Sequence, residues 1–190
     1  MAAAAVAAPL AVNALPAFAS ERVVLPSDAW TYATTRQPAA SFWDAPRAEV
    51  LVGREYDEAF VWRSFFRVPV AAVSGASVAS AVFSILLTHT PTGVATPVQL
   101  FQVTDLDPEA PLTWNNSGGS WLRNLGTASG SSWNSQPDQL LRFDVTSLAQ
   151  EAAGQGLAFL SFGLRAANET DRYQWKKFKP GSELLEVITL

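Results

Sequence analysis

Apolar and polar residues alternate with a period of about two along most of the chain after residue 20, in short runs separated by Pro, Gly, Ser and Asp. In residues 58–70 one side carries Phe60, Trp62, Ser64, Phe66 and Val68, and the other carries Val61, Arg63, Phe65 and Arg67. Successive side chains of a strand point to opposite faces of a sheet, so this run predicts a strand. Residues 78–87 alternate in the same way. With the runs at 97–105, 157–167 and 183–190, the pattern predicts about eight or nine strands.

One segment changes its period along its length. Residues 140–156 begin as a strand and continue with helical spacing, and Thr146 or Ser147 is a suitable N-cap. The sequence therefore predicts one short helix near residues 147–153. Many short strands and a single helix are typical of an all-β sandwich of two antiparallel sheets. Because no internal repeat or linker divides residues 20–190, we expect them to form one domain.

The first 19 residues carry no charged side chain, and they end in Ala-Phe-Ala before Ser20. A small-x-small ending after an apolar run is what signal peptidase accepts, so residues 1–19 are interpreted as a secretory signal peptide that is removed. Pro9 and Pro16 interrupt the segment, which argues against a membrane span. A disordered Ala-rich leader is the alternative. We expect a secreted mature chain that starts near Ser20.

Composition narrows the possible functions further. The chain contains no cysteine, which excludes disulfide and thiolate chemistry and makes a bacterial secreted protein more natural than a eukaryotic one. Its formal net charge of −4 argues against nucleic acid as a partner, because phosphate binding needs a basic surface.

The stretch PLTWNNSGG, residues 111–119, combines a tryptophan with hydrogen-bonding residues that favour turns. Leu112 and Trp114 alternate on the side expected to face the core, while Asn115 and Asn116 suit the end of a strand. The segment is therefore predicted to be a turn with Trp114 in the sandwich core, and the alternative is the floor of a binding site.

The order of these segments resembles the secreted bacterial DNRLRE-type domain, which is related to alginate-binding carbohydrate-binding modules. The resemblance rests on five stretches of this sequence: 62–70, 76–87, 111–116, 141–156 and 183–190. It implies a jelly-roll β-sandwich and an acidic polysaccharide as the ligand. The sequence departs from the family pattern at 104–110, where TDLDPEA replaces a common Trp-x-Glu.

The segment DRYQWKKFK, residues 171–179, interleaves basic and aromatic side chains in an otherwise acidic chain. Aromatic rings stack on the apolar faces of sugars, and cations suit the acidic polysaccharide that the resemblance implies. The predicted ligand-binding residues are Arg172, Tyr173, Trp175, Lys176, Lys177 and Lys179. The alternative is an edge strand whose lysines prevent edge-to-edge pairing.

The segment TDLDPEA places Asp105, Asp107 and Glu109 at alternating positions. This spacing allows carboxylates to converge on Ca²⁺ from a tight loop, although the glycine and the distal Glu of an EF-hand are missing. We consider a structural Ca²⁺ site at these three residues, with a solvated acidic loop as the alternative. No other cofactor is predicted.

Catalytic signatures are missing from the sequence. His89 is the only histidine, and its position at a strand end beside a proline suggests a structural or merely exposed side chain. No nucleophile elbow is found, and the carboxylates show no pairing signature. The protein is not expected to be an enzyme.

These observations predict a secreted, non-catalytic β-sandwich module that binds polysaccharide, with an acidic polymer favoured. A structural or adhesive subunit of an extracellular assembly, docking on a protein partner through exposed strand edges, is the alternative. Neither nucleic acid nor a membrane span in the mature chain is expected.

Overall fold

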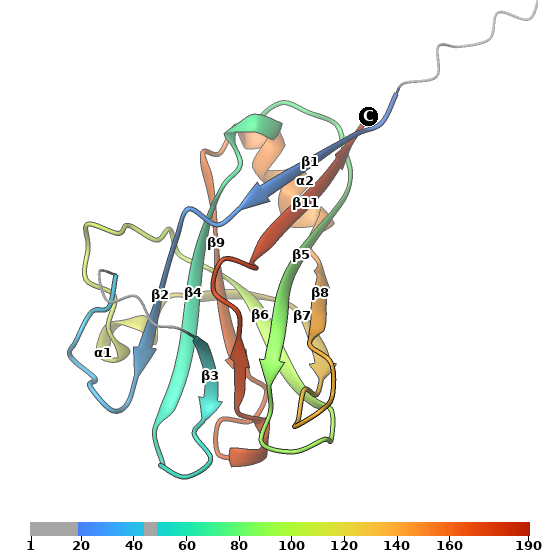
Figure 1. Ribbon diagram of the computed structural model, residues 1–190. Helices are drawn as coiled ribbons and strands as arrows, with labels where there is room; N and C mark the ends of the chain where they lie inside the picture. The colour runs from blue at the N-terminus through green and yellow to red at the C-terminus, as the bar shows by residue number, and fades with distance from the viewer. Residues whose placement is uncertain (1–18, 44–48) are drawn as a thin grey trace, which may run out of the picture.

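The computed structural model describes residues 19–43 and 49–190, and these residues form two antiparallel sheets packed face to face (Figure 1). The first sheet contains β1 (Glu21–Pro26), β5 (Val78–His89), β8 (Gln139–Asp144), β10 (Lys176–Phe178) and β11 (Leu184–Thr189). The second sheet contains β2 (Ala29–Thr34), β4 (Val61–Pro69), β6 (Thr96–Val103), β7 (Trp121–Gly130) and β9 (Phe159–Ala166). The remaining strand, β3 (Val50–Arg54), pairs with β10 and with β4 and so joins the sheets.

The strand order is that of a jelly roll. One sheet runs β3-β10-β5-β8 and the other runs β4-β9-β6-β7, so from β3 to β10 the chain changes sheet at every connection except the one between β6 and β7. β11 extends β10 along the same edge of β5, and β1 and β2 are additions at the periphery. The predicted all-β sandwich of two antiparallel sheets is confirmed.

The predicted alternation along β4 is also confirmed. Phe66 and Val68 lie in the core between the sheets, where Phe66 and Phe162 both contact Phe83 from the opposite sheet. Phe65, one residue out of phase, belongs to a second apolar cluster on the outer face of the same sheet. A period of two thus places Phe66 and Val68 in one cluster and Phe65 in the other.

The helix predicted near residues 147–153 is α2 (Thr146–Gln155), and it buries Leu148, Ala149, Ala152 and Ala153 at one end of the sandwich. Its predicted cap is wrong: Val145 occupies the N-cap position and makes no side-chain cap bond. The Thr146 hydroxyl instead accepts from the Ala81 N–H at 3.0 Å, which ties the helix to β5. Gly156 ends the helix at φ 65°, a left-handed conformation that suits glycine.

The stretch around Trp114 forms a short helix, α1 (Trp114–Ser117), rather than a simple turn. The Thr113 hydroxyl accepts from the Asn116 N–H at 3.2 Å, and the Asn116 side chain accepts from the Thr113 N–H at 2.8 Å. This reciprocal capping box stabilises a helix of only one turn. Trp114 is half-buried against the outer cluster that contains Phe65, so the prediction that it lies in the inter-sheet core is wrong.

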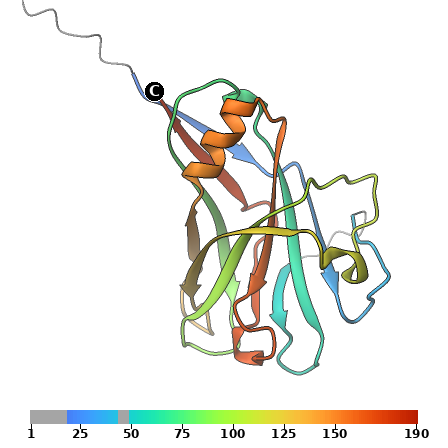
Figure 2. The same ribbon diagram turned by 180° about the vertical axis from the view of Figure 1, so that it is seen from behind.

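The two ends of the sandwich differ. α2 and the C-terminus lie at one end, whereas the loops that follow β3, β5, β7 and β9 gather at the opposite end (Figure 1, Figure 2). These loops comprise residues 55–60, 90–95, 131–138 and 167–175. Loops on a rigid β-scaffold are where binding sites are usually built, and the candidate site described below lies among them.

The predicted signal peptide, residues 1–19, lies outside the described part of the chain except for Ala19. Within residues 19–43 and 49–190, no helix has the length and apolar character that crossing a membrane requires.

Candidate functional site

A pocket of about 380 Å³ opens at the loop end of the sandwich. It combines two indole rings, a phenol, an imidazole and a carboxylate from four separate segments. Its lining consists of Tyr56, Asp57, His89, Pro91, Trp133 and Trp175. Aromatic walls with a few polar groups are the usual composition of a site for a small or ring-shaped ligand.

The His89 ring contacts both tryptophans of the pocket. It is the last residue of β5, where it is paired in register with Lys177 of β10. The centroid of its ring lies 5.7 Å from that of Trp133 and 5.6 Å from that of Trp175. Burial, and then the charge of Lys177, lower the pKa of His89, so the imidazole is neutral at pH 7. A neutral imidazole offers one donor and one acceptor to a ligand.

Trp133 forms the exposed wall of the pocket, with 37% of the residue accessible to solvent. The backbone N–H of Trp133 donates to the Gln136 side-chain oxygen at 3.0 Å, and the backbone N–H of Gln136 donates back to the Trp133 carbonyl at 3.0 Å. Asn134 within this turn has φ 52°, a left-handed conformation that asparagine tolerates. The turn holds a large apolar ring in solvent, where burial does not account for it.

Trp175 forms the inner wall and is held from behind by the backbone of β3. Gly53 has φ 90°, and a Cβ at that position would lie 3.2 Å from the Trp175 Cα and 3.1 Å from the Gln174 carbonyl oxygen. Glycine therefore permits a close approach of the two segments. The ammonium of Lys177 lies 5.3 Å from the centroid of the Trp175 ring and 2.8 Å from a carboxylate oxygen of Glu49.

A second aromatic group borders the pocket. The Tyr56 and Tyr173 rings meet edge to face with centroids 5.7 Å apart, and the Arg172 guanidinium carbon lies 4.6 Å and 5.4 Å from those two centroids. Arg172 and Tyr173 belong to the 3₁₀ helix η2 (Arg172–Gln174), whose N-cap Asp171 accepts from the Tyr173 N–H at 2.9 Å. Hydrogen bonding to Arg172 lowers the pKa of the Tyr173 phenol.

The predicted binding residues are thus divided by the structure. Trp175 lines the pocket, Lys177 contacts its ring, and Arg172 and Tyr173 stand at its border. Lys179 is exposed beyond β10. Only residues 176–178 of the segment form a strand, and this strand, β10, lies between β3 and β5, so the alternative interpretation as an edge strand is wrong.

Lys176 is a correction, because its side chain is completely buried. Its amine donates to the Thr96 hydroxyl rather than to solvent or to a ligand. Burial lowers the pKa of Lys176 to about 8, and the negative charge of Asp171 partly opposes this shift. Composition alone did not separate Lys176, in the buried part of β10, from Arg172, which is exposed on the preceding 3₁₀ helix η2.

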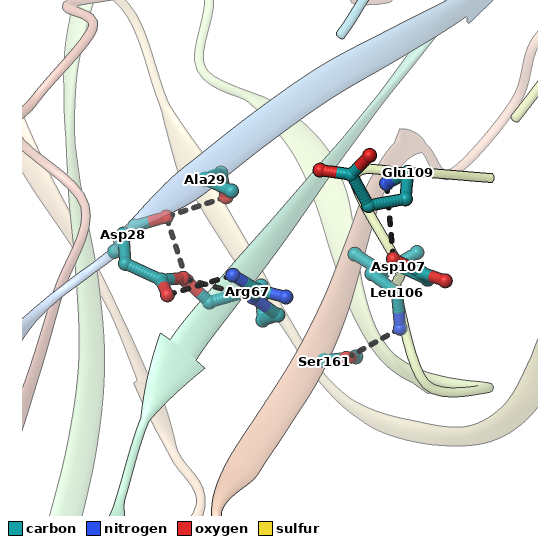
Figure 3. A network of polar contacts seen from close by, with 8 residues as sticks. Asp28, Ala29, Arg67, Leu106, Asp107, Glu109 and Ser161 are labelled. Carbon is teal, nitrogen blue, oxygen red and sulfur yellow. Dashed lines mark hydrogen bonds and ion pairs between the residues drawn. The ribbon is translucent and has the colours of Figure 1, made fainter. Parts of the chain in front are cut away.

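The three predicted calcium ligands do not form a site. Asp107 accepts from the Glu109 N–H at 2.9 Å, and the Glu109 carboxylate points away from it (Figure 3). The intervening Leu106 is buried, and its N–H donates to the Ser161 hydroxyl at 3.1 Å. Asp105 is exposed. Within residues 19–43 and 49–190 no group of three or more His, Cys, Asp or Glu side chains is arranged to hold a metal ion.

Sequence reasoning missed five of the six pocket residues: Tyr56, Asp57, His89, Pro91 and Trp133. His89 was expected to be structural or exposed, and Trp133 was only one of several tryptophans in polar surroundings. No local motif marks these positions, because the jelly-roll connections bring them together from three different loops and strand ends.

Comparison with known proteins identifies no family. No family model matches the chain, and no curated protein is similar to it. Among solved structures, the K1 cleaved adhesin domain of Lys-gingipain from Porphyromonas gingivalis W83 is similar over 88% of this chain and 97% of its own, with 5% identity and a TM-score of 0.39. The K3 cleaved adhesin domain of the same protein is similar over 78% of this chain and 97% of its own, with 7% identity and a TM-score of 0.34. Latent apple tyrosinase is 12% identical with a TM-score of 0.34 over 90% of this chain, which spans only 28% of the tyrosinase chain. These TM-scores are too low to bear on function.

Proposed function

We propose that this protein is a secreted, non-catalytic module that binds polysaccharide in the pocket between Trp133 and Trp175. The observation that carries the proposal is the grouping of two indoles, a phenol and a neutral imidazole at the loop end of a rigid sandwich. Sugar rings present apolar C–H faces that stack on indoles, and their hydroxyls hydrogen-bond to carboxylate and imidazole groups such as Asp57 and His89.

The proposed ligand is an acidic polymer, although the charges around the pocket are more balanced than the sequence indicates. Arg172, Lys177 and Lys179 favour a polyanion. Lys177 is paired with Glu49, however, and Asp57 lines the pocket itself. We therefore expect a preference for polyuronate over the same polymer as its methyl ester, of roughly three- to tenfold in affinity and decreasing with salt.

Affinity gel electrophoresis and calorimetry with polygalacturonate and its methyl ester test the proposal. Trp133→Ala and Trp175→Ala should each abolish most of the retention shown by the native protein. Leu122→Ala is the matched control, because Leu122 is a 58% exposed apolar residue on β7, outside the pocket lining. Absence of retention of the native protein on uronate, sulfated and neutral polymers alike would contradict polysaccharide binding.

A structural or adhesive subunit is the second candidate, and two strands favour it. Within the described residues, β7 pairs only with β6 and β8 pairs only with β5, and these strands carry the exposed side chains of Leu122 and Leu140. Exposed strand edges with apolar residues can accept a strand from a partner. Size-exclusion chromatography with light scattering tests this candidate: oligomers that Leu140→Lys dissolves would support it, and a strict monomer would count against it.

A further inference from the structure

The group formed by Tyr56, Tyr173 and Arg172 stands beside the pocket without a packing role that explains it. Tyr173 is 43% exposed and Arg172 is exposed as well. Within the described residues neither tyrosine belongs to any of the three apolar clusters. Exposed aromatic rings held together at the border of a pocket are typical of a contact surface.

Tyr56 connects this group to the pocket. It lines the pocket together with Asp57, and its ring also contacts Tyr173 and Arg172 at 5.7 Å and 4.6 Å. A linear ligand that leaves the pocket across Tyr56 therefore meets Tyr173 and Arg172 next. A guanidinium that lies against aromatic rings keeps N–H donors at its edge for oxygen acceptors.

The second group is also fixed in position before any ligand arrives. Asp171 accepts from the Tyr173 N–H at 2.9 Å, and the Gln174 side chain accepts from the Asn168 N–H at 2.9 Å. The Arg54 guanidinium donates to the Thr170 carbonyl at 3.1 Å, which anchors the loop to β3. A platform that is already ordered loses little entropy when a ligand binds.

We infer that the protein recognises at least two consecutive sugar rings, one in the Trp133–Trp175 pocket and the next on the platform formed by Tyr56, Tyr173 and Arg172. This inference rests on the proposed function and specifies its ligand class: an oligomer or the interior of a chain, not a single sugar. Affinity should therefore rise from the monomer to short oligomers and then level off.

Calorimetry with galacturonate oligomers of one to six units, and with cello-oligomers of the same lengths as a neutral series, tests the inference. In the series that binds, the two- or three-ring oligomer should bind at least about tenfold more tightly than the monomer, which corresponds to about 1.4 kcal/mol. Tyr173→Ala should remove most of this gain and leave monomer affinity unchanged. Trp175→Ala should weaken every length.

The controls separate failure of this inference from failure of the proposed function. Leu122→Ala should reproduce the native length dependence, and circular dichroism melting should show that Tyr173→Ala remains folded because the ring is exposed. Equal affinity for the monomer and the hexamer, or an equal loss for both on Tyr173→Ala, would overturn the second subsite while leaving polysaccharide binding intact. No binding in either series would overturn both.

Discussion

Two tryptophan groups of similar composition differ in whether they line an open pocket. On the outer face of the second sheet, Arg63 lies 4.2 Å from the Trp114 ring centroid and 5.5 Å from that of Trp121. At the loop end, Lys177 lies 5.3 Å from the centroid of Trp175. Each group packs against an apolar cluster, and residues 106–114 contribute to the first, but only the second also lines an open pocket, where Trp133 is exposed.

In the covered group the cation is paired within the protein. Arg63 donates to both carboxylate oxygens of Glu169, at 2.8 Å and 2.6 Å, with side chains only 16% and 21% exposed. Gly163 allows Trp121 to lie against β9, because a Cβ there would fall 2.7 Å from the indole. The indole N–H groups of Trp121 and Trp175 both lack an acceptor among the described residues, so that feature does not distinguish the groups. The two groups have similar composition, so the proposed difference in their roles rests on the open pocket beside Trp133 and Trp175.

Trp121→Ala should show the largest effect on stability and none on ligand binding. The ring contacts Phe65, Phe101 and the backbone at Gly163, and the substitution would leave a cavity that β-strands cannot close. We expect a loss of about 3 kcal/mol in the free energy of unfolding, measured by urea denaturation. Trp133→Ala should lose less than about 1 kcal/mol and abolish binding. The reverse pattern would contradict the division into a covered and an open group.

Each tryptophan group has a cation with little or no solvent exposure nearby, Arg63 in the first and Lys176 at the second, and comparing them gives a second test. Arg63 has a carboxylate partner, whereas the Lys176 amine donates to the Thr96 hydroxyl. The pKa of Lys176 is about 8 in the folded protein and about 10.5 in the unfolded chain. Because the folded value is the lower one, protonation of the Lys176 amine destabilises the folded protein. This penalty is absent above pH 10.5 and grows as the pH falls to 8. At pH 7 the folded protein bears this full penalty.

Lys176→Met should therefore stabilise the protein at pH 7 by up to about 3 kcal/mol. The gain over the native chain should shrink between pH 8 and pH 10.5, and parallel urea titrations of the two proteins at each pH measure it. Lys179→Met, at an exposed position, is the matched control and should show no such trend. A destabilised Lys176→Met protein at every pH would mean that the amine contributes favourably to the fold.

Trp114→Ala should have an intermediate effect. A fully buried tryptophan in the inter-sheet core would cost about 3 to 5 kcal/mol on truncation. Because Trp114 is half-buried, and its main charged contact is Arg63, we expect about 1 to 2 kcal/mol. Urea denaturation measures the loss. Unchanged stability together with lost polysaccharide binding would assign Trp114 to a binding site after all.

Strand periodicity was sufficient to predict the fold because it depends on neighbouring residues. The alternation at residues 60–68 places Phe66 inside and Arg63 outside, as the structure shows. The prediction that failed in this part of the molecule concerned Trp114, whose environment depends on a chain segment packed over the outer face of the sheet. A local pattern indicates which face a side chain occupies, but not what covers that face.

The site was predicted only in part, because its members are distant in sequence. Trp175 and Tyr173 were found through the basic-aromatic composition of one segment. Their partners Trp133 and Tyr56 come from other loops and carry no spacing signal. Lys176 was misplaced because composition does not show where the 3₁₀ helix ends and the buried strand begins.

The smallest expected effect is also the most specific to the open pocket, and it concerns His89. Burial and the charge of Lys177 lower its pKa in the folded protein below the ordinary 6.5, while Glu49 opposes the shift. The stability that the neutral ring contributes is therefore complete above pH 6.5 and is lost as pH falls through the folded-state pKa. Protonation also adds a positive charge beside the two indoles, in the pocket proposed to bind the acidic polymer.

Binding of a galacturonate oligomer should accordingly strengthen as the pH falls through the folded-state pKa of His89, because the imidazolium attracts carboxylates, and His89→Gln, which cannot be protonated, should flatten that dependence. Calorimetry from pH 7.5 to pH 5 measures the binding, and the NMR titration of the single imidazole measures its pKa directly. In the covered group no histidine is present, so the stability difference between the native and Trp121→Ala proteins should not change over the same range. A measured pKa of His89 at or above 6.5 would contradict the burial of its ring in the pocket and the pH dependence of binding expected from it.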